Sequence, residues 1–216
     1  MNDFVYTPTT EQPVIIYADH EILVVGKPAG LLSVPGKGDD RTDCLIARLR
    51  GPYPMVLLVH RLDLDTSGVM VFGLTAHAQR HLGLQFEHRQ TRKHYIARLW
   101  GHLAPKEGHV DLPLCVDWPQ RPRQHVDFEN GRPAQTDWRV MRYEDNTTRV
   151  RLTPLTGRSH QLRVHMKEQG HPILGDPLYA EGPALEFPRL MLHAESLRLR
   201  HPDGGKHMTF TVPCPF

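Results

Sequence analysis

The segment "VHRLDLDTSGVMVFGLT", residues 59–75, places an arginine and two aspartates directly before a run of apolar residues. Residues 69–74 are apolar on both alternations, which predicts a strand buried on both faces. Carboxylates are costly to bury at such a place without partners. Asp63 and Asp65 are therefore candidates for function, and the rest of the chain must supply their context.

Composition limits the kind of protein that the chain can be. With 216 residues it is long enough for one large domain or two small ones. It is 39% hydrophobic, shows no basic leader before an apolar core, and has no run near the roughly 18 apolar residues of a membrane span. We therefore expect a cytoplasmic protein with no membrane partner. The 3 cysteines are far apart, which argues against disulfides and against paired zinc ligands.

The 15 histidines raise the question of a metal. His160 and His165 lack the spacing of a HExxH ligand set, and Glu168 follows them instead of lying between them. We therefore expect no metal site, and a histidine-rich metallohydrolase is an alternative that bound zinc or iron would reveal.

The formal net charge is only +2, so any nucleic-acid footprint must be local. Two basic clusters occur, "HRQTRKHY" at 88–95 and "WPQRPRQH" at 118–125. In the second cluster Arg121 and Arg123 follow Trp118. These two arginines, together with Arg89, Arg92 and Lys93 of the first cluster, are candidates to contact nucleic-acid phosphates. Taken alone, either cluster could be an ordinary solvated face.

Strand patterns outnumber helical ones along the chain. Helices are predicted at 44–50, 76–90 and 160–169, with N-caps at Thr42 or Asp43, at Thr75 and at Ser159. Alternating or continuous apolar runs predict strands at 13–19, 20–28, 93–101, 109–114, 134–144, 148–156, 190–201 and 208–213. Many strands with few helices and no regular βα alternation predict an α+β protein, built on a mixed, mostly antiparallel sheet flanked by a few helices.

The two aspartates could be a paired acid and base, as in glycoside hydrolysis. That chemistry needs the carboxyl groups on opposite sides of the scissile bond, whereas residues two apart on an extended segment project to the same face. One working carboxylate fits better. The other would then bond turn amides or the hydroxyl of Thr66 or Ser67.

The segment "HRLDLDTSG" resembles the HRLDxxTSG signature of the RluA family of pseudouridine synthases. Three further blocks agree in order. "DHEILVVGKPAGLLSVPG" (19–36) resembles the family's opening strand and KPxG loop, "RKHYIARLWG" (92–101) the strand that bears its tyrosine, and "LTGRSHQLRVHMKEQGHPILGDPLY" (155–179) its third motif. The resemblance implies the pseudouridine synthase fold, with an N-terminal extension over 1–13, a catalytic domain over 14–216 and no S4-type RNA-binding module.

The resemblance also implies roles for particular residues. Asp63 matches the catalytic aspartate, Tyr95 the tyrosine that stacks on the target base, and Arg163 the arginine that pairs with the aspartate. The phenol of Tyr95 could also reach C5 of the base and help to remove its proton. Arg61 matches a residue that fills the space left by a flipped uridine, and Leu192 matches an apolar wall beneath the base. Asp65 falls at a variable position of the pattern.

The implied reaction breaks the N1–C1′ bond of uridine and joins C5 to C1′, with no redox change, so no cofactor and no metal is expected. Asp63 would act as a nucleophile at C1′ or as a base at the 2′ proton, and the sequence leaves both routes open. The short chain and the segment at 110–124 resemble the family's dual-specificity type. This implies a 23S ribosomal RNA hairpin and a transfer RNA anticodon stem-loop as partners of a monomer. An RNA-binding module without catalysis, or a synthase with another uridine target, is the alternative.

Overall fold

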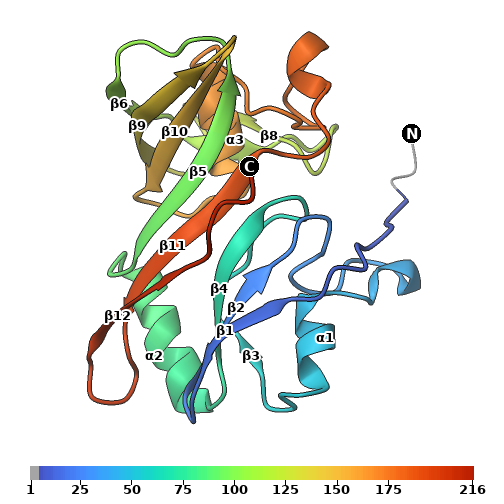
Figure 1. The fold of residues 1–216 in the computed structure, drawn as a ribbon, viewed down its shortest axis with the longest axis vertical. Helices are drawn as coiled ribbons and strands as arrows, with labels where there is room; N and C mark the ends of the chain where they lie inside the picture. The colour runs from blue at the N-terminus through green and yellow to red at the C-terminus, as the bar shows by residue number, and fades with distance from the viewer. Residues whose placement is uncertain (1–4) are drawn as a thin grey trace. The chain divides into compact units, whose positions relative to one another are not determined.

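The computed structural model describes residues 5–216, and their contacts divide the chain into two compact units. Unit 1 holds the residues up to Thr91 together with Ala194–Pro213, and unit 2 holds Arg92–His193 together with Cys214–Phe216. Figure 1 shows the strands and helices of both units. No helix among residues 5–216 has the length and the apolar character needed to cross a membrane.

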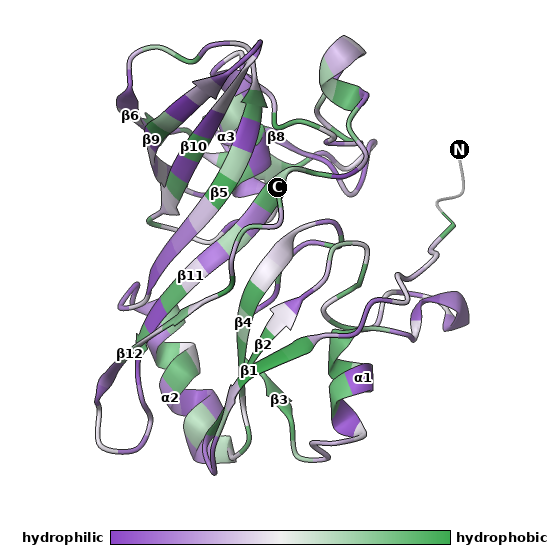
Figure 2. Cartoon of the chain, in the orientation of Figure 1, coloured by the Kyte–Doolittle hydropathy of each residue, from purple (hydrophilic) through white to green (hydrophobic). Residues whose placement is uncertain are grey.

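Unit 1 is built on antiparallel strands in which β2 lies between β1 and β4. The short β3 also pairs with β4, and β12 pairs with β11. The elements are β1 (Val14–Ala18), β2 (Ile22–Lys27), a 3₁₀ turn (Asp39–Arg41), α1 (Leu45–Arg50), β3 (Leu57–Leu58), β4 (Ser67–Gly73), α2 (Ala76–Glu87), β11 (Leu192–Arg200), which begins in unit 2, and β12 (His207–Thr211). Every residue of β4 is buried, which confirms the strand predicted to be covered on both faces. Figure 2 shows hydrophobic residues along β1, β2 and β4.

Unit 2 is a second antiparallel arrangement, with the strand order β5-β10-β9-β6 and a separate β7–β8 hairpin. The elements are β5 (Arg92–Trp100), β6 (Glu107–Asp111), β7 (Leu114–Val116), β8 (Gln124–Val126), β9 (Gln135–Glu144), β10 (Thr147–Pro154), α3 (Gln161–Glu168) and a 3₁₀ turn (Gly182–Leu185). In Figure 1, α3 lies behind β9 and β10. Leu162 and Met166 of α3 share a hydrophobic core with Ala97, Leu99 and Leu152. This core therefore marks the inner face of the sheet.

The predicted α+β class is confirmed, since antiparallel strands dominate and the described residues hold three α-helices. The predicted cap of α2 is confirmed as well. Thr75 is its N-cap, and its Oγ1 accepts a hydrogen bond from the Ala78 N–H at 3.0 Å.

The two other predicted caps are wrong. The N-cap of α1 is Cys44, and its side chain makes no capping bond. Asp43 does not cap the helix because its carboxylate pairs with Arg48 instead, at 2.7 Å. The N-cap of α3 is His160, which has φ 52° and also makes no side-chain capping bond, and not Ser159. A charged partner competes with the helix amides for the Asp43 carboxylate, and a left-handed residue moves the start of α3 by one position.

The described part of the N-terminal extension packs against the rest of unit 1. Tyr6 is only 7% exposed, and its hydroxyl donates to the Asp43 carbonyl at 2.9 Å. Arg48 donates to the Thr9 carbonyl at 2.7 Å. Residues 1–4 of the expected extension lie outside the described residues.

Gly68, at the start of β4, has φ +122°, and a Cβ built there would overlap the Ala194 carbonyl oxygen. We expect Gly68→Ala to lower the free energy of unfolding by several kcal/mol, because a strained backbone and overpacking each cost about 1–3 kcal/mol. The matched control is Gly83→Ala within α2, where a Cβ would meet nothing within 4 Å. That change should raise stability by about 0.5–1 kcal/mol. Urea denaturation measures both, and equal midpoints would contradict the prediction.

Candidate active site

The backbone on the N-terminal side of Asp63 is held by a buried serine. The Leu62 N–H donates to Ser33 Oγ at 3.1 Å, and the same hydroxyl donates to the Leu62 carbonyl at 2.7 Å. Ser33 is 3% exposed and Leu62 is 7% exposed, so water does not compete for these bonds. One side chain of the segment at 19–36 therefore satisfies both backbone groups of the residue before Asp63.

The C-terminal side of Asp63 is held by the lysine of the KPxG loop. Lys27 is 2% exposed, and its Nζ donates to the carbonyls of Pro28, Leu31 and Leu64 at 2.9, 2.6 and 2.9 Å. Three acceptors match the three donors of an ammonium group, which makes its burial tolerable. Asp63 itself is half-buried, so it is a partly accessible carboxylate on a backbone fixed from both sides.

His60 of the same signature has a structural role. Its Nε2 accepts a hydrogen bond from the Val71 N–H at 3.0 Å, and its ring stacks on Phe86 with centroids 4.5 Å apart. The bond requires an unprotonated Nε2. His60 therefore joins the signature loop to β4 and α2 of unit 1.

The expectation for Asp65 is corrected in one detail. Thr66 Oγ1 is buried and has no hydrogen-bond partner among the described residues, so Asp65 does not bind that hydroxyl. The turn is closed instead by the backbone, where the Thr66 N–H donates to the Asp63 carbonyl at 3.2 Å.

Tyr95 lies on β5 in unit 2, in register with Leu152 of β10. Residues paired in this way point to the same face of the sheet, so Tyr95 shares the inner face with α3. It is half-buried and packs against the hydrophobic core of unit 2. Part of its ring is therefore accessible and part is held by packing.

Arg163, on α3, is 3% exposed and forms a bidentate pair with Asp176. Its Nε donates to Oδ2 at 2.8 Å and its Nη2 to Oδ1 at 2.6 Å. Asp176 is fully buried and also accepts from the N–H groups of Leu178 and Tyr179. Sequence reasoning missed Asp176, although it stands in the "GDPLY" that closes the third motif. The predicted pairing of Arg163 with Asp63 stays a prediction.

Tyr179 links α3 to the β7–β8 hairpin. The Arg163 guanidinium lies 5.1 Å from the centre of its ring. The Tyr179 hydroxyl accepts a hydrogen bond from the Gln124 N–H at 2.8 Å and forms another with His160 Nδ1 at 2.7 Å. The hairpin that carries Arg121 and Arg123 is thus anchored next to Arg163.

The predicted substrate-binding residues lie in contrasting surroundings. Arg121 is exposed and lies 4.5 Å from the ring centre of Trp118, which is itself 65% exposed. Arg123 is half-buried and Arg61, in unit 1, is exposed. Leu192 is 3% exposed and belongs to the core of unit 2. Its predicted contact with a base therefore stays a prediction.

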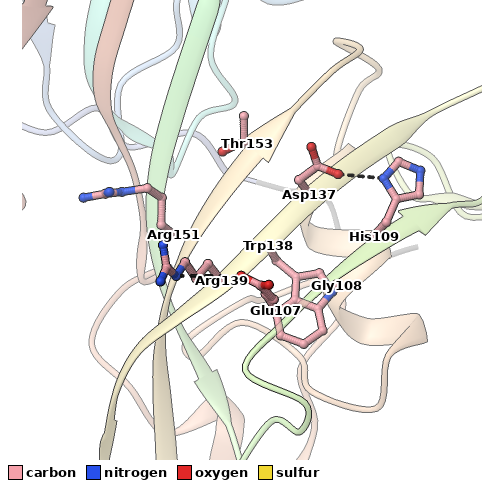
Figure 3. Close-up of a pocket in the computed structure, with 8 residues that line it drawn as sticks. All are labelled: Glu107, Gly108, His109, Asp137, Trp138, Arg139, Arg151 and Thr153. Carbon is pink, nitrogen blue, oxygen red and sulfur yellow. Dashed lines mark hydrogen bonds and ion pairs between the residues drawn. The ribbon is translucent and has the colours of Figure 1, made fainter.

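Unit 2 also has an open pocket of about 540 Å³, drawn in Figure 3. It is lined by Glu107, Gly108, His109, Asp137, Trp138, Arg139, Arg151 and Thr153. Arg151 and Thr153 flank Leu152 on β10, so their side chains point away from the face that bears Tyr95. His109 Nδ1 lies 2.6 Å from Asp137 Oδ1, and Arg139 Nε lies 3.9 Å from Glu107 Oε2. No predicted site residue lines this pocket, and we assign the chemistry to the opposite face.

The histidines considered as metal ligands have other partners. His165 is buried, contacts Thr136 Oγ1 at 2.9 Å and the Leu112 carbonyl at 3.1 Å, and its pKa is lowered by burial. His160 bonds Tyr179. Within residues 5–216, no three His, Cys, Asp or Glu side chains gather as a group that could hold a metal ion.

Known proteins resemble this chain over nearly its whole length. A model of the RNA pseudouridylate synthase family matches residues 21–168. The chain is 54% identical over 214 residues to the "Dual-specificity RNA pseudouridine synthase RluA" of Escherichia coli (strain K12), which covers 98% of each chain. It is 49% identical to the protein of that name from Pasteurella multocida, again over 98% of each. The solved structure of human RNA pseudouridylate synthase domain containing 1 matches with a TM-score of 0.81 and 32% identity, over 97% of this chain and 86% of that one. The chain therefore belongs to the RNA pseudouridylate synthase family, in its RluA branch.

Proposed function

We propose that this chain isomerises uridine to pseudouridine in RNA, with Asp63 as the catalytic carboxylate. The observation that carries the proposal is the signature loop, in which Ser33 and Lys27 fix the backbone on both sides of a half-buried Asp63. Buried partners on both sides are what a precisely placed nucleophile or base needs. The carboxylate acts at C1′ as a nucleophile or at the 2′ proton as a base.

Tyr95 and Arg163 are proposed to complete the catalytic set. A target uridine must leave its stack, at a cost of a few kcal/mol that is smallest in a loop. Stacking on the partly accessible ring of Tyr95 would return about 1–3 kcal/mol. An arginine favours the ionised form of a carboxylate with which it pairs, and Asp176 holds the Arg163 guanidinium in one orientation for that role.

The proposed substrates are a 23S ribosomal RNA hairpin and a transfer RNA anticodon stem-loop. The relatives are named dual-specificity RNA pseudouridine synthases, which supports more than one RNA target for this chain. Arg61 is proposed to fill the space of the flipped uridine and Leu192 to lie beneath the base. We also propose a catalytic domain over 14–216 that acts as a cytoplasmic monomer without cofactor or metal.

The test is tritium release. The protein is incubated with each of the two RNAs, tritiated at C5 of uridine, and the tritium that enters water is counted. Release from both RNAs supports the proposal, and release from one limits the specificity to that RNA. No release, with RNA binding still measurable, would contradict catalysis on these substrates and favour a binding module.

We expect the Arg121→Ala/Arg123→Ala variant to bind the stem-loop more weakly. The hairpin face that bears these arginines is suited to phosphate contacts, and the slope of log K against log salt should fall by about 0.7–0.9 for each phosphate that the variant no longer binds. Titration of the RNA at several salt concentrations measures the slope.

The matched control is Arg50→Ala, which removes an exposed arginine from α1 in unit 1. Its slope should equal that of the wild type. An unchanged slope in the hairpin variant would remove Arg121 and Arg123 from the RNA-binding surface.

A further inference from the structure

Lys93, the second residue of β5, is a half-buried lysine whose ammonium group has few polar partners. Its Nζ donates one hydrogen bond, to the Thr156 carbonyl at 3.3 Å, and among the described residues it forms no ion pair. Lys27, the other lysine with a buried ammonium, donates to three carbonyls. The contrast matters because a desolvated ammonium without partners is costly, so a chain that retains one needs a compensating reason.

Lys93 shares the inner face of the sheet with Tyr95. The two residues are two apart on β5, so their side chains point to the same side, with Cα atoms about 6.6 Å apart. Among residues 5–216, apart from Gly157 and its two chain neighbours, Lys93 Nζ is the only atom within 4 Å of the place that a Cβ at Gly157 would occupy, at 3.8 Å. The glycine therefore leaves open space beside the amine, on the side of the third motif.

The neighbouring elements of unit 2, all within the described chain, bring no anion to Lys93. Arg158, on the loop after β10, donates to the Pro133 carbonyl, and Arg163 on α3 is paired with Asp176. His160, at the start of α3, bonds Tyr179. Desolvation alone lowers the pKa of Lys93 to about 8, so a substantial share of the amine is neutral just above neutral pH.

The reaction needs a base to remove the proton from C5, a step separate from the one proposed for Asp63 at C1′ or at the 2′ proton. Once C5 has joined C1′, C5 still carries its hydrogen, and that proton must leave before the uracil ring regains its C5–C6 double bond. The C–H electron pair becomes the double bond, and N1, which began the reaction bonded to C1′, gains a proton. The isomerisation is therefore balanced by one proton that leaves C5 and one that arrives at N1.

We propose that Lys93 is the general base that removes the C5 proton, and that the ammonium so formed returns a proton to N1. This inference rests on the proposed function and deepens it. It leaves Tyr95 as the stacking platform and assigns to Lys93 the C5 proton transfer that sequence reasoning had also allowed the Tyr95 phenol. Lys93 thereby becomes a catalytic residue, where sequence reasoning placed a phosphate contact. An amine that is desolvated, has a single hydrogen-bond partner and lies on the same sheet face as Tyr95 suits this step, since the best base is one that is partly deprotonated at the working pH.

The test compares Lys93→Met and Lys93→Arg with the wild type on the anticodon stem-loop, carrying protium or deuterium at C5 of the target uridine. Both variants should lose kcat by about 10²- to 10⁴-fold, with little change in KM. Both should show a larger deuterium isotope effect on kcat than the wild type, because removal of the C5 proton becomes the slow step. Wild-type kcat should rise with pH through about 8, and the variants should lose that rise.

The matched control is Lys106→Met, which removes an exposed lysine from the same unit and should change none of these quantities. Full activity in Lys93→Arg, with weak RNA binding in Lys93→Met, would show an anion-binding lysine and overturn the proposal. A lower kcat with an unchanged isotope effect would overturn it as well. If neither variant folds, a wild-type kcat that does not rise with pH through about 8 would overturn the proposal. Failure of the proposed function is a separate result, since the wild type would then release no tritium.

Discussion

The Asp63→Asn variant is expected to fold like the wild type and to lose turnover by at least about 10⁴-fold, the scale on which essential nucleophiles and bases act. Asparagine has nearly the same shape as aspartate but offers no charged oxygen for attack at C1′ or for removal of the 2′ proton. The backbone at position 63 is held through Leu62 and Leu64, and neither set of bonds involves the Asp63 side chain. The fold should therefore not depend on the carboxylate.

The matched control for this prediction is Asp65→Asn. Asp65 is also half-buried and lies in the same loop, so the substitution changes charge and hydrogen bonding in similar surroundings. We expect its tritium release to stay within about tenfold of the wild type, the scale of about 1.4 kcal/mol in a barrier. Filter binding of the RNA should be retained by both variants. Turnover by Asp63→Asn, or equal loss in both variants, would take the catalytic role away from Asp63.

The Arg163→Met variant is expected to lower the free energy of unfolding by about 3–5 kcal/mol. Arg163 is 3% exposed and Asp176 is fully buried, so loss of the guanidinium would leave an uncompensated carboxylate in the core of unit 2. The two backbone N–H groups that bind Asp176 would remain, but they do not neutralise its charge. Urea denaturation, followed by circular dichroism, measures the loss.

A double-mutant cycle separates the ion pair from the packing around it. Arg163→Met/Asp176→Leu should be more stable than Arg163→Met alone, because it removes the charge that the single variant strands. The surface control is Arg139→Met, which breaks a pair with Glu107 whose side chains are 79% and 75% exposed. We expect it to cost less than about 1 kcal/mol. Equal losses in Arg163→Met and Arg139→Met would show that burial does not determine the energetics of the Arg163–Asp176 pair.

The sequence by itself determined the family, the α+β class and the positions of most elements. These follow from local patterns that lie within a few residues of one another. The signature at 60–68 is contiguous, β4 is apolar on both alternations, and the Thr75 cap acts on a residue three positions away. Local patterns failed where another partner competed, as at Asp43, whose carboxylate binds Arg48 in place of the amides of α1.

Only the tertiary structure decided what surrounds each functional side chain. The Arg163 guanidinium pairs with Asp176, 13 residues away. The Lys27 ammonium donates to the Leu64 carbonyl across 37 residues, and the Lys93 ammonium donates to the Thr156 carbonyl across 63. The physical reason is that desolvation and hydrogen bonding depend on which segments pack together, and a one-dimensional pattern carries no record of that packing. Lys27 and Lys93 are the same residue type, yet three carbonyls satisfy the ammonium of the first, whereas burial beside a single carbonyl lowers the pKa of the second to about 8.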